Sequence, residues 1–270
     1  MKYAFMSFSC PRLPLQGMLA LAVNSGYDGI EPRLEAGHLH GIEIGTSMAE
    51  RAEIRGLAEK SGIRICCLAT GVCLTDPEKQ AEELVSARKA MELAKDIGCP
   101  LIRVFGGAYP DKVSRSEAIT HLARAFRDLI PDAERTGVQI CLETHDHWCH
   151  PEHVSEVLAL VDHPTAGVNW DFQHPLRTCG WNVENSFRLL SPWILHVHFH
   201  DGTLEQSRLE MLPAGEGVYE VEKAVKLLQS IRYKGYLSGE WFDWPDYTEY
   251  LPREVSRMRK FEESSSNNPD

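Results

Sequence analysis

Short apolar runs alternate with longer amphipathic stretches along most of the chain. The runs are rich in valine, isoleucine and leucine, which is typical of strands in a parallel sheet covered on both faces. Eight strands are predicted, at residues 3–7, 29–32, 63–69, 101–105, 138–143, 167–171, 195–200 and 236–241. The stretches between them have the period of surface helices. This alternation predicts an α/β fold, and eight strand-helix units favour a single (β/α)8 TIM barrel over an open sheet.

Capping residues indicate where several helices begin. Asp76 and Pro77 supply an N-cap and a first-turn proline ahead of a long helical pattern. Ser114 and Glu117 have the spacing of a capping box before the next helix. We expect Pro131 to bend or shorten that helix, because proline cannot donate the backbone hydrogen bond.

Length and composition favour one domain. The chain has 270 residues, of which 43% are hydrophobic and 25% are charged, an ordinary globular balance. No G-x-G-x-x-G motif follows the first predicted strand, which argues against a dinucleotide-binding fold. We expect the barrel to cover residues 1–263, and the polar segment at residues 264–270 to be a disordered tail.

Charge and cysteine content limit the partners of the protein. The formal net charge is −11, so binding to nucleic acid is not expected, because neutralising phosphates requires clustered lysine and arginine. We also expect no membrane contact, since no apolar stretch has the length of a membrane span and the N-terminal segment lacks signal-peptide features. The eight cysteines include no C-x-x-C pair, which favours reduced thiols in a cytoplasmic protein. Whether the chain forms a homo-oligomer stays open.

Metal-ligand side chains recur where predicted strands end. Glu143, Asp171, His198 and Glu240 close the runs VQICLE, AGVNWD, ILHVH and YLSGE. A single carboxylate at such a position is usually an ordinary loop residue. Four such residues at equivalent positions, however, would converge on one mouth of a barrel. Three carboxylates and one imidazole suit a divalent ion, and we expect Mn²⁺, with Mg²⁺, Co²⁺ and Zn²⁺ as alternatives.

Three histidines alternate with apolar residues in the seventh predicted strand. Because side chains alternate along a strand, His196, His198 and His200 should share one face. A lone strand histidine is usually a satisfied core residue, but three on one face indicate a polar, functional interior. The spacing His198-x-x-Asp201 selects His198 as the metal ligand among them.

Two further histidines lie close in sequence to predicted ligands. His174 follows Asp171 with the spacing Asp-x-x-His, so the pair could supply one metal ligand and one substrate contact. If the strand that ends at Glu143 continued, its period would return His145 to the same face, about 7 Å further up. At that place His145 would hold a substrate hydroxyl or protonate a leaving group.

Taken together, these motifs resemble the xylose isomerase-like TIM barrel superfamily. The segments LETH, NWDFQHP, HVHFHD and SGEW carry the resemblance, and GYDGIEP at residues 26–32 resembles the second strand of that superfamily. Its members include sugar isomerases and epimerases, inosose and dehydroshikimate dehydratases, and an AP-endonuclease branch. The resemblance implies that His174 and Arg208 contact the substrate. It also implies one divalent metal ion bound by four residues, Glu143, Asp171, His198 and Glu240.

Several reactions are compatible with such a site. An ion that chelates a ketone and the neighbouring hydroxyl acidifies the carbon-bound proton, which Glu143 and Glu240 could remove and return. We therefore expect an isomerase or epimerase of a small sugar or keto-polyol. The alternative is a lyase or dehydratase of the inosose, dehydroshikimate or 3-keto-sugar type with the same metal ligands. His145, His147 and His150 beside Glu143 favour that alternative, since a second base would assist elimination.

Two other classes of protein fit the sequence less well. A DNA-repair enzyme of the AP-endonuclease branch requires further histidine ligands, yet the third and fourth predicted strands end in CCLATG and RVFGG. The negative net charge also argues against a DNA substrate. A ligand-binding barrel without activity would not need an intact set of four ligands. Phosphorylated and free sugars both stay open, because Arg208 could hold a phosphate, a carboxylate or a hydroxyl.

Overall fold

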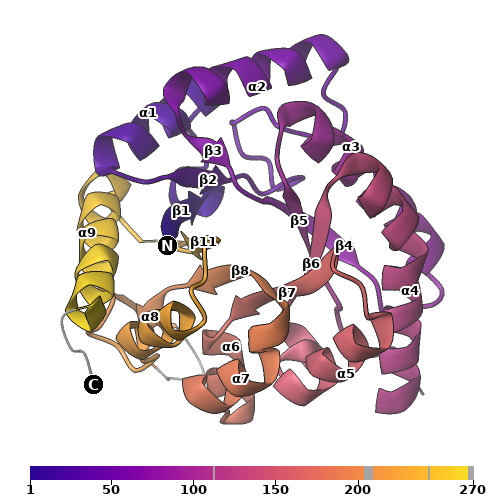
Figure 1. Ribbon diagram of the computed structural model, residues 1–270. Coiled ribbons are helices and arrows are strands. Elements are labelled where there is room, and N and C mark those ends of the chain that lie inside the picture. The colour runs from indigo at the N-terminus through magenta and orange to yellow at the C-terminus, as the bar shows by residue number, and fades with distance from the viewer. Residues whose placement is uncertain (112, 204–208, 243, 267–270) are drawn as a thin grey trace.

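Parallel strands form the inner wall of a barrel, and helices cover its outside (Figure 1). The computed structural model describes residues 1–111, 113–203, 209–242 and 244–266. The strand order in the sheet is β3-β2-β1-β11-β8-β7-β6-β5-β4, and each of these pairings is parallel. The predicted (β/α)8 barrel is therefore confirmed.

Strands and helices alternate along the described chain. The barrel strands are β1 Lys2–Met6, β2 Gly29–Glu31, β3 Arg64–Ile65, β4 Leu68–Cys73, β5 Leu101–Phe105, β6 Gln139–Glu143, β7 Ala166–Asp171, β8 Ile194–Phe199 and β11 Tyr236–Gly239. Two short strands form a separate antiparallel pair, β9 Asp201–Gly202 and β10 Met211–Leu212. The α-helices are α1 Leu15–Ser25, α2 Met48–Ser61, α3 Gln80–Ile97, α4 Arg115–Thr136, α5 Pro151–Val161, α6 Gln173–Cys179, α7 Val183–Leu190, α8 Val221–Ser230 and α9 Tyr247–Ser266.

The barrel closes where the third predicted strand is divided in two. β3 and β4 take the place of the single strand predicted at residues 63–69. At the junction, the Ala69 amide donates to the Pro32 carbonyl at 3.0 Å, and the Leu34 amide donates to the Ala69 carbonyl at 2.9 Å. These bonds continue the pairing with β2, so β3 and β4 together occupy one strand position.

A small cluster of buried side chains lies inside the barrel. It contains Ala4, Cys66, Cys67, Leu101 and Cys141, and it is separate from the larger apolar cluster between strands and helices. Because side chains two apart on a strand share a face, Glu143 projects to the same side as the cluster member Cys141. The cluster therefore forms a floor beneath the carboxyl ends of the strands. All eight cysteines are free thiols.

The helices match one prediction made from the sequence, the capping box of α4, and differ from two others, at Pro131 and at Asp76. The predicted capping box of α4 is present, since the Ser114 amide donates to the Glu117 carboxylate at 2.8 Å. The helix then continues through Pro131 to Thr136, so the predicted shortening is wrong. Buried residues of α4 on both sides of the proline keep the helix packed. Asp76 lies in a turn ahead of α3, which begins three residues later than predicted, at Gln80.

The last helix alters the predicted tail. α9 runs to Ser266, three residues beyond the predicted barrel end at residue 263. Residues 267–270 lie outside the described residues, so their disorder stays a prediction. No helix in the described part of the chain has the length and apolar character needed to cross a membrane.

Candidate metal centre

Four neighbouring strands bring the predicted ligands together. Glu143 ends β6, Asp171 ends β7, His198 lies one residue before the end of β8, and Glu240 directly follows β11. These strands are adjacent in the order β11-β8-β7-β6, and Asp171 pairs with His198 in register. One ligand atom from each of the four residues lies within 4.8 Å of the others. The strand-end pattern in the sequence thus corresponds to one cluster in space.

Burial makes this cluster costly without a cation. Asp171 and His198 are fully buried, Glu143 is 1% exposed, and the Glu240 side chain is 12% exposed. Burial, together with the charge of Glu143, raises the pKa of both Asp171 and Glu240 to about 7. Asp171 Oδ2 is buried and has no hydrogen-bond partner among the described residues. A divalent cation would supply that missing partner and favour the ionised carboxylates, so these residues fit a metal ion.

A buried arginine holds Glu143 ionised. Arg103 in β5 places its Nε atom 2.9 Å from Glu143 Oε2, and both side chains are buried. The arginine is fixed from its other end, where Nη1 donates to the Thr70 carbonyl at 2.7 Å. Burial alone would raise the pKa of Glu143, but Arg103 and then His198 hold that pKa well below its ordinary value. Arg103 is not among the residues predicted from the sequence, because it lies inside the apolar run LIRVF.

A second missed residue orients the histidine ligand. Glu31 at the end of β2 is fully buried, and its carboxylate lies 3.0 Å from His198 Nε2 and 2.8 Å from His196 Nε2. With a proton on Nε2, the Nδ1 lone pair of His198 faces Glu143 Oε1 at 3.3 Å and Glu240 Oε2 at 3.6 Å. This is the carboxylate-histidine arrangement that orients metal ligands in other proteins. The signal was present in GIEP, where Glu31 closes a predicted strand like the other carboxylates.

His145 and His174 lie together beside the cluster. Their ring centroids are 4.3 Å apart, and His174 Nε2 lies 3.7 Å from Asp171 Oδ2. The backbone conformation that places His145 beside the cluster differs from the prediction. β6 does not continue past Glu143, because the His145 amide turns back to donate to the Glu143 carbonyl at 2.9 Å. The predicted 7 Å step along a strand is therefore wrong, although His145 still flanks the site.

Two other predicted positions have different outcomes. Arg208 lies outside the described residues, so its substrate contact stays a prediction. Asp201 has a local structural task, since its carboxylate accepts hydrogen bonds from the Gly202, Gly215 and Gly217 amides at 2.8–3.1 Å. It therefore organises the loop after β8. His200 is buried, and neither of its ring nitrogens has a hydrogen-bond partner in the described structure.

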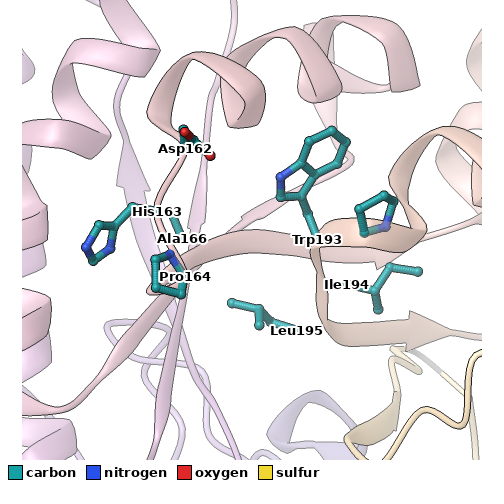
Figure 2. A pocket seen from close by; sticks show the side chains of 8 residues that line it. Asp162, His163, Pro164, Ala166, Trp193, Ile194 and Leu195 are labelled. Carbon is teal, nitrogen blue, oxygen red and sulfur yellow. The ribbon is translucent and has the colours of Figure 1, made fainter.

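A cleft of about 370 Å³ has none of these residues in its lining, and Figure 2 shows the side chains that line it. It is lined by residues just before and at the start of β7 and β8, including His163, Pro164 and Trp193. The candidate ligands lie at the opposite, carboxyl ends of the same strands. This cleft therefore belongs to the other face of the barrel, where conserved chemistry is not expected in TIM barrels.

The fold and the cluster define a class of protein, a parallel α/β barrel with a candidate metal centre at the carboxyl ends of its strands. The chain belongs to the xylose isomerase-like TIM barrel family, whose sequence profile matches residues 19–260. The resemblance inferred from the sequence motifs is thus confirmed.

Relatives of known activity are enzymes with small substrates. The chain is 22% identical over 261 residues to 3-dehydroshikimate dehydratase of Bacillus anthracis, which covers 90% of this chain and 91% of the relative. It is also 22% identical over 255 residues to L-ribulose-5-phosphate 3-epimerase UlaE of Salmonella paratyphi A, covering 89% and 86%. Among solved structures, the IOLI protein with a bound zinc atom superposes with a TM-score of 0.82 at 19% identity, covering 99% of this chain and 100% of that protein.

Proposed function

We propose that this protein is a divalent-metal-dependent isomerase or epimerase of a small sugar or keto-polyol. One observation carries the proposal. Glu143 and Glu240 stand at the two ends of an arc of four strands, with Asp171 and His198 between them and all four ligand atoms within 4.8 Å. Two carboxylates can therefore approach one bound substrate from two directions, as a transfer of a proton between two faces or two carbons requires.

The chain's own residues divide the work as follows. Glu143, Asp171, His198 and Glu240 would hold the ion. When bound, a divalent ion supplies Lewis-acid polarisation of a ketone and its neighbouring hydroxyl. One of the two glutamates removes the proton from the carbon that bears this hydroxyl, next to the ketone, and the other returns it. Return on the opposite face gives an epimer, and return to the other carbon gives an isomer. Arg103 keeps Glu143 in the ionised state in which it accepts a proton.

Substrate binding is assigned to residues at the same mouth. His145 and His174 lie side by side next to Asp171, where hydroxyl groups of a chelated sugar would extend. Arg208, which lies outside the described residues, is proposed as a further substrate contact. We propose Mn²⁺ as the resident ion, cytoplasmic location, and no nucleic-acid or membrane partner. Self-association into a homo-oligomer is compatible with the proposal and is not required by it.

A lyase is the second candidate, and His145 is the observation in its favour. His145 Nδ1 lies 2.9 Å from Asp146 Oδ1. Burial alone would lower the pKa of His145, but Asp146 and then Glu143 raise it, so the pKa is raised overall. A protonated imidazole beside the substrate could act as the acid that releases a hydroxyl. The relative 3-dehydroshikimate dehydratase catalyses a dehydration by name, which is in keeping with this candidate.

Turnover and metal content test the main proposal together. Glu143→Gln and Glu240→Gln should each lower turnover of the active ketose roughly 10²–10⁴-fold, the usual effect of a positioned proton-transfer group. Metal content is measured in the same samples, because both residues are also ligands. Asp171→Asn and His198→Ala should lose the ion. Near-normal turnover of either glutamine variant with its ion bound would exclude the two-carboxylate mechanism.

The variant His145→Ala separates the two candidates. If His145 only binds a hydroxyl, its loss should weaken substrate binding by about 1–3 kcal/mol, with chemistry preserved. If it is the acid of an elimination, product formation should fall steeply while exchange of the carbon-bound proton with solvent deuterium continues. Intact exchange with abolished product would therefore favour the lyase over the isomerase.

A further inference from the structure

A second cluster of ligand-type residues lies outside the central cluster, at the start of α5. The sequence His150-Pro-Glu-His supplies His150, Glu152 and His153, and one ligand atom of each lies within 4.8 Å of the other two. The two imidazole rings are stacked, with centroids 4.7 Å apart and an angle of 28° between planes. None of the three residues belongs to the central cluster, so the two groups are separate.

One buried polar atom of this second cluster lacks a partner in the described part of the chain. Glu152 Oε2 is buried and has no hydrogen-bond partner among the described residues. A buried carboxylate oxygen without a partner is costly, because the oxygen loses its hydration. A cation between the three side chains would satisfy it.

The third residue is already oriented for metal binding. His153 is 8% exposed, and its Nδ1 lies 3.0 Å from the Tyr109 hydroxyl, which also approaches the His147 carbonyl at 3.5 Å. If the Tyr109 hydroxyl donates a hydrogen bond to that carbonyl, its oxygen accepts a hydrogen bond from His153 Nδ1–H. The Nε2 atom of His153 then keeps a free lone pair.

We propose that His150, Glu152 and His153 form a second metal site, selective for Zn²⁺. Two imidazoles and one carboxylate are a known zinc ligand set with an open fourth position, whereas Mg²⁺ and Mn²⁺ prefer oxygen ligands. The positive end of the α5 dipole opposes a cation, and the Glu152 carboxylate offsets that effect. Arg115, the nearby positive group, is itself paired with Glu156 at 2.6 Å.

The site would have a structural consequence for the barrel mouth. His150 ends the loop that begins after Glu143 and carries His145, whereas Glu152 and His153 belong to the helix. An ion bound to all three fixes the end of this loop to α5. Through the Tyr109 hydroxyl it also connects to the loop after β5. The inference does not depend on the reaction proposed for the central site.

Zinc stoichiometry tests the inference on the full-length protein. Metal-free protein is titrated with Zn²⁺ against a chromophoric chelator, which removes ions held by isolated surface histidines. The wild type should bind two equivalents, and the central variant Asp171→Asn with His198→Ala should keep one. The double variant His150→Gln with His153→Gln should lose the other. The matched control His163→Gln, which replaces a histidine just after α5, should still bind two.

A conservative variant keeps the test independent of folding. Glu152→Gln preserves size and removes the charge of a half-buried side chain, so the fold should be unchanged by circular dichroism. It should weaken the second equivalent at least tenfold while the central equivalent is unchanged. Zinc binding by the wild type that is fully retained in the double glutamine variant would overturn the proposal. So would a second equivalent whose affinity in Glu152→Gln and in the double glutamine variant is the same as in the wild type.

Discussion

Replacing Glu31 by glutamine should weaken metal binding although Glu31 is not one of the four candidate ligands. The carboxylate accepts hydrogen bonds from His196 Nε2 at 2.8 Å and from His198 Nε2 at 3.0 Å. An amide of the same size has a single acceptor oxygen, so its NH₂ group must face one of the two ring N–H groups. If the NH₂ group faces His198, two donors oppose each other. His198 can then avoid this only by carrying its proton on Nδ1, the atom that faces the other ligands.

The size of the effect follows from this geometry. Loss of a buried charge-assisted hydrogen bond leaves a donor unsatisfied, which costs about 1–3 kcal/mol. Removal of the partner that orients a metal-bound histidine typically lowers metal affinity by roughly 10–100-fold. These figures agree, since a tenfold change corresponds to about 1.4 kcal/mol. We therefore expect the Mn²⁺ dissociation constant of Glu31→Gln to rise by roughly 10–100-fold.

The assay is competition for Mn²⁺ between metal-free protein and an indicator chelator at neutral pH. Glu254→Gln is the matched control, because Glu254 is also fully buried and bonds the Ala214 amide at 2.8 Å. It should change stability without changing metal affinity. An unchanged dissociation constant in Glu31→Gln, or equal weakening in both variants, would refute the reasoning.

Three further predictions concern stability, measured by urea unfolding. Gly106→Ala should destabilise by about 1–3 kcal/mol, since the new Cβ would lie 2.1 Å from the buried Trp148 ring; Gly56→Ala, with open space, should not destabilise. Burial lowers the pKa of His40 to about 4 in the folded state, below the ordinary 6.5 of the unfolded chain. Its stabilisation is thus complete above pH 6.5 and falls by up to about 3 kcal/mol towards pH 4, a loss that His40→Gln should abolish. Arg103→Met should cost about 3–5 kcal/mol, because it leaves a buried carboxylate unpaired; a loss below about 1 kcal/mol would contradict the ion pair.

The strand-end rule found the four candidate ligands because each closes a clear apolar run. Glu31 obeys the same rule, but β2 is only three residues long and is followed by a proline, so its run gave a weak signal. Arg103 could not be found this way. A charged residue within an apolar strand does not fit the strand pattern, and its role becomes clear only from its partner Glu143 on the neighbouring strand β6. Partners distant in sequence are the information that local periodicity lacks.

The predicted ends of helices and strands are wrong where tertiary contacts override the local preference of the sequence. Pro131 did not shorten α4, because buried residues on either side hold the helix in place. The strand predicted at residues 63–69 is divided in two. Its first part pairs with β2, and its second part pairs with the loop after β2, which closes the barrel. His145 reached the site through a tight turn after Glu143, a conformation that strand periodicity cannot indicate.

Proton exchange at the carbon next to a substrate ketone tests the central claim most directly. Metal-replete protein is incubated in D₂O with a panel of ketoses, inososes and keto acids, and products are followed by NMR. We expect deuterium at one carbon next to the ketone of an accepted substrate, lost on removal of the metal and strongly reduced in Glu240→Gln. Turnover of a substrate without any deuterium uptake, or equal uptake by metal-free protein, would contradict the claim.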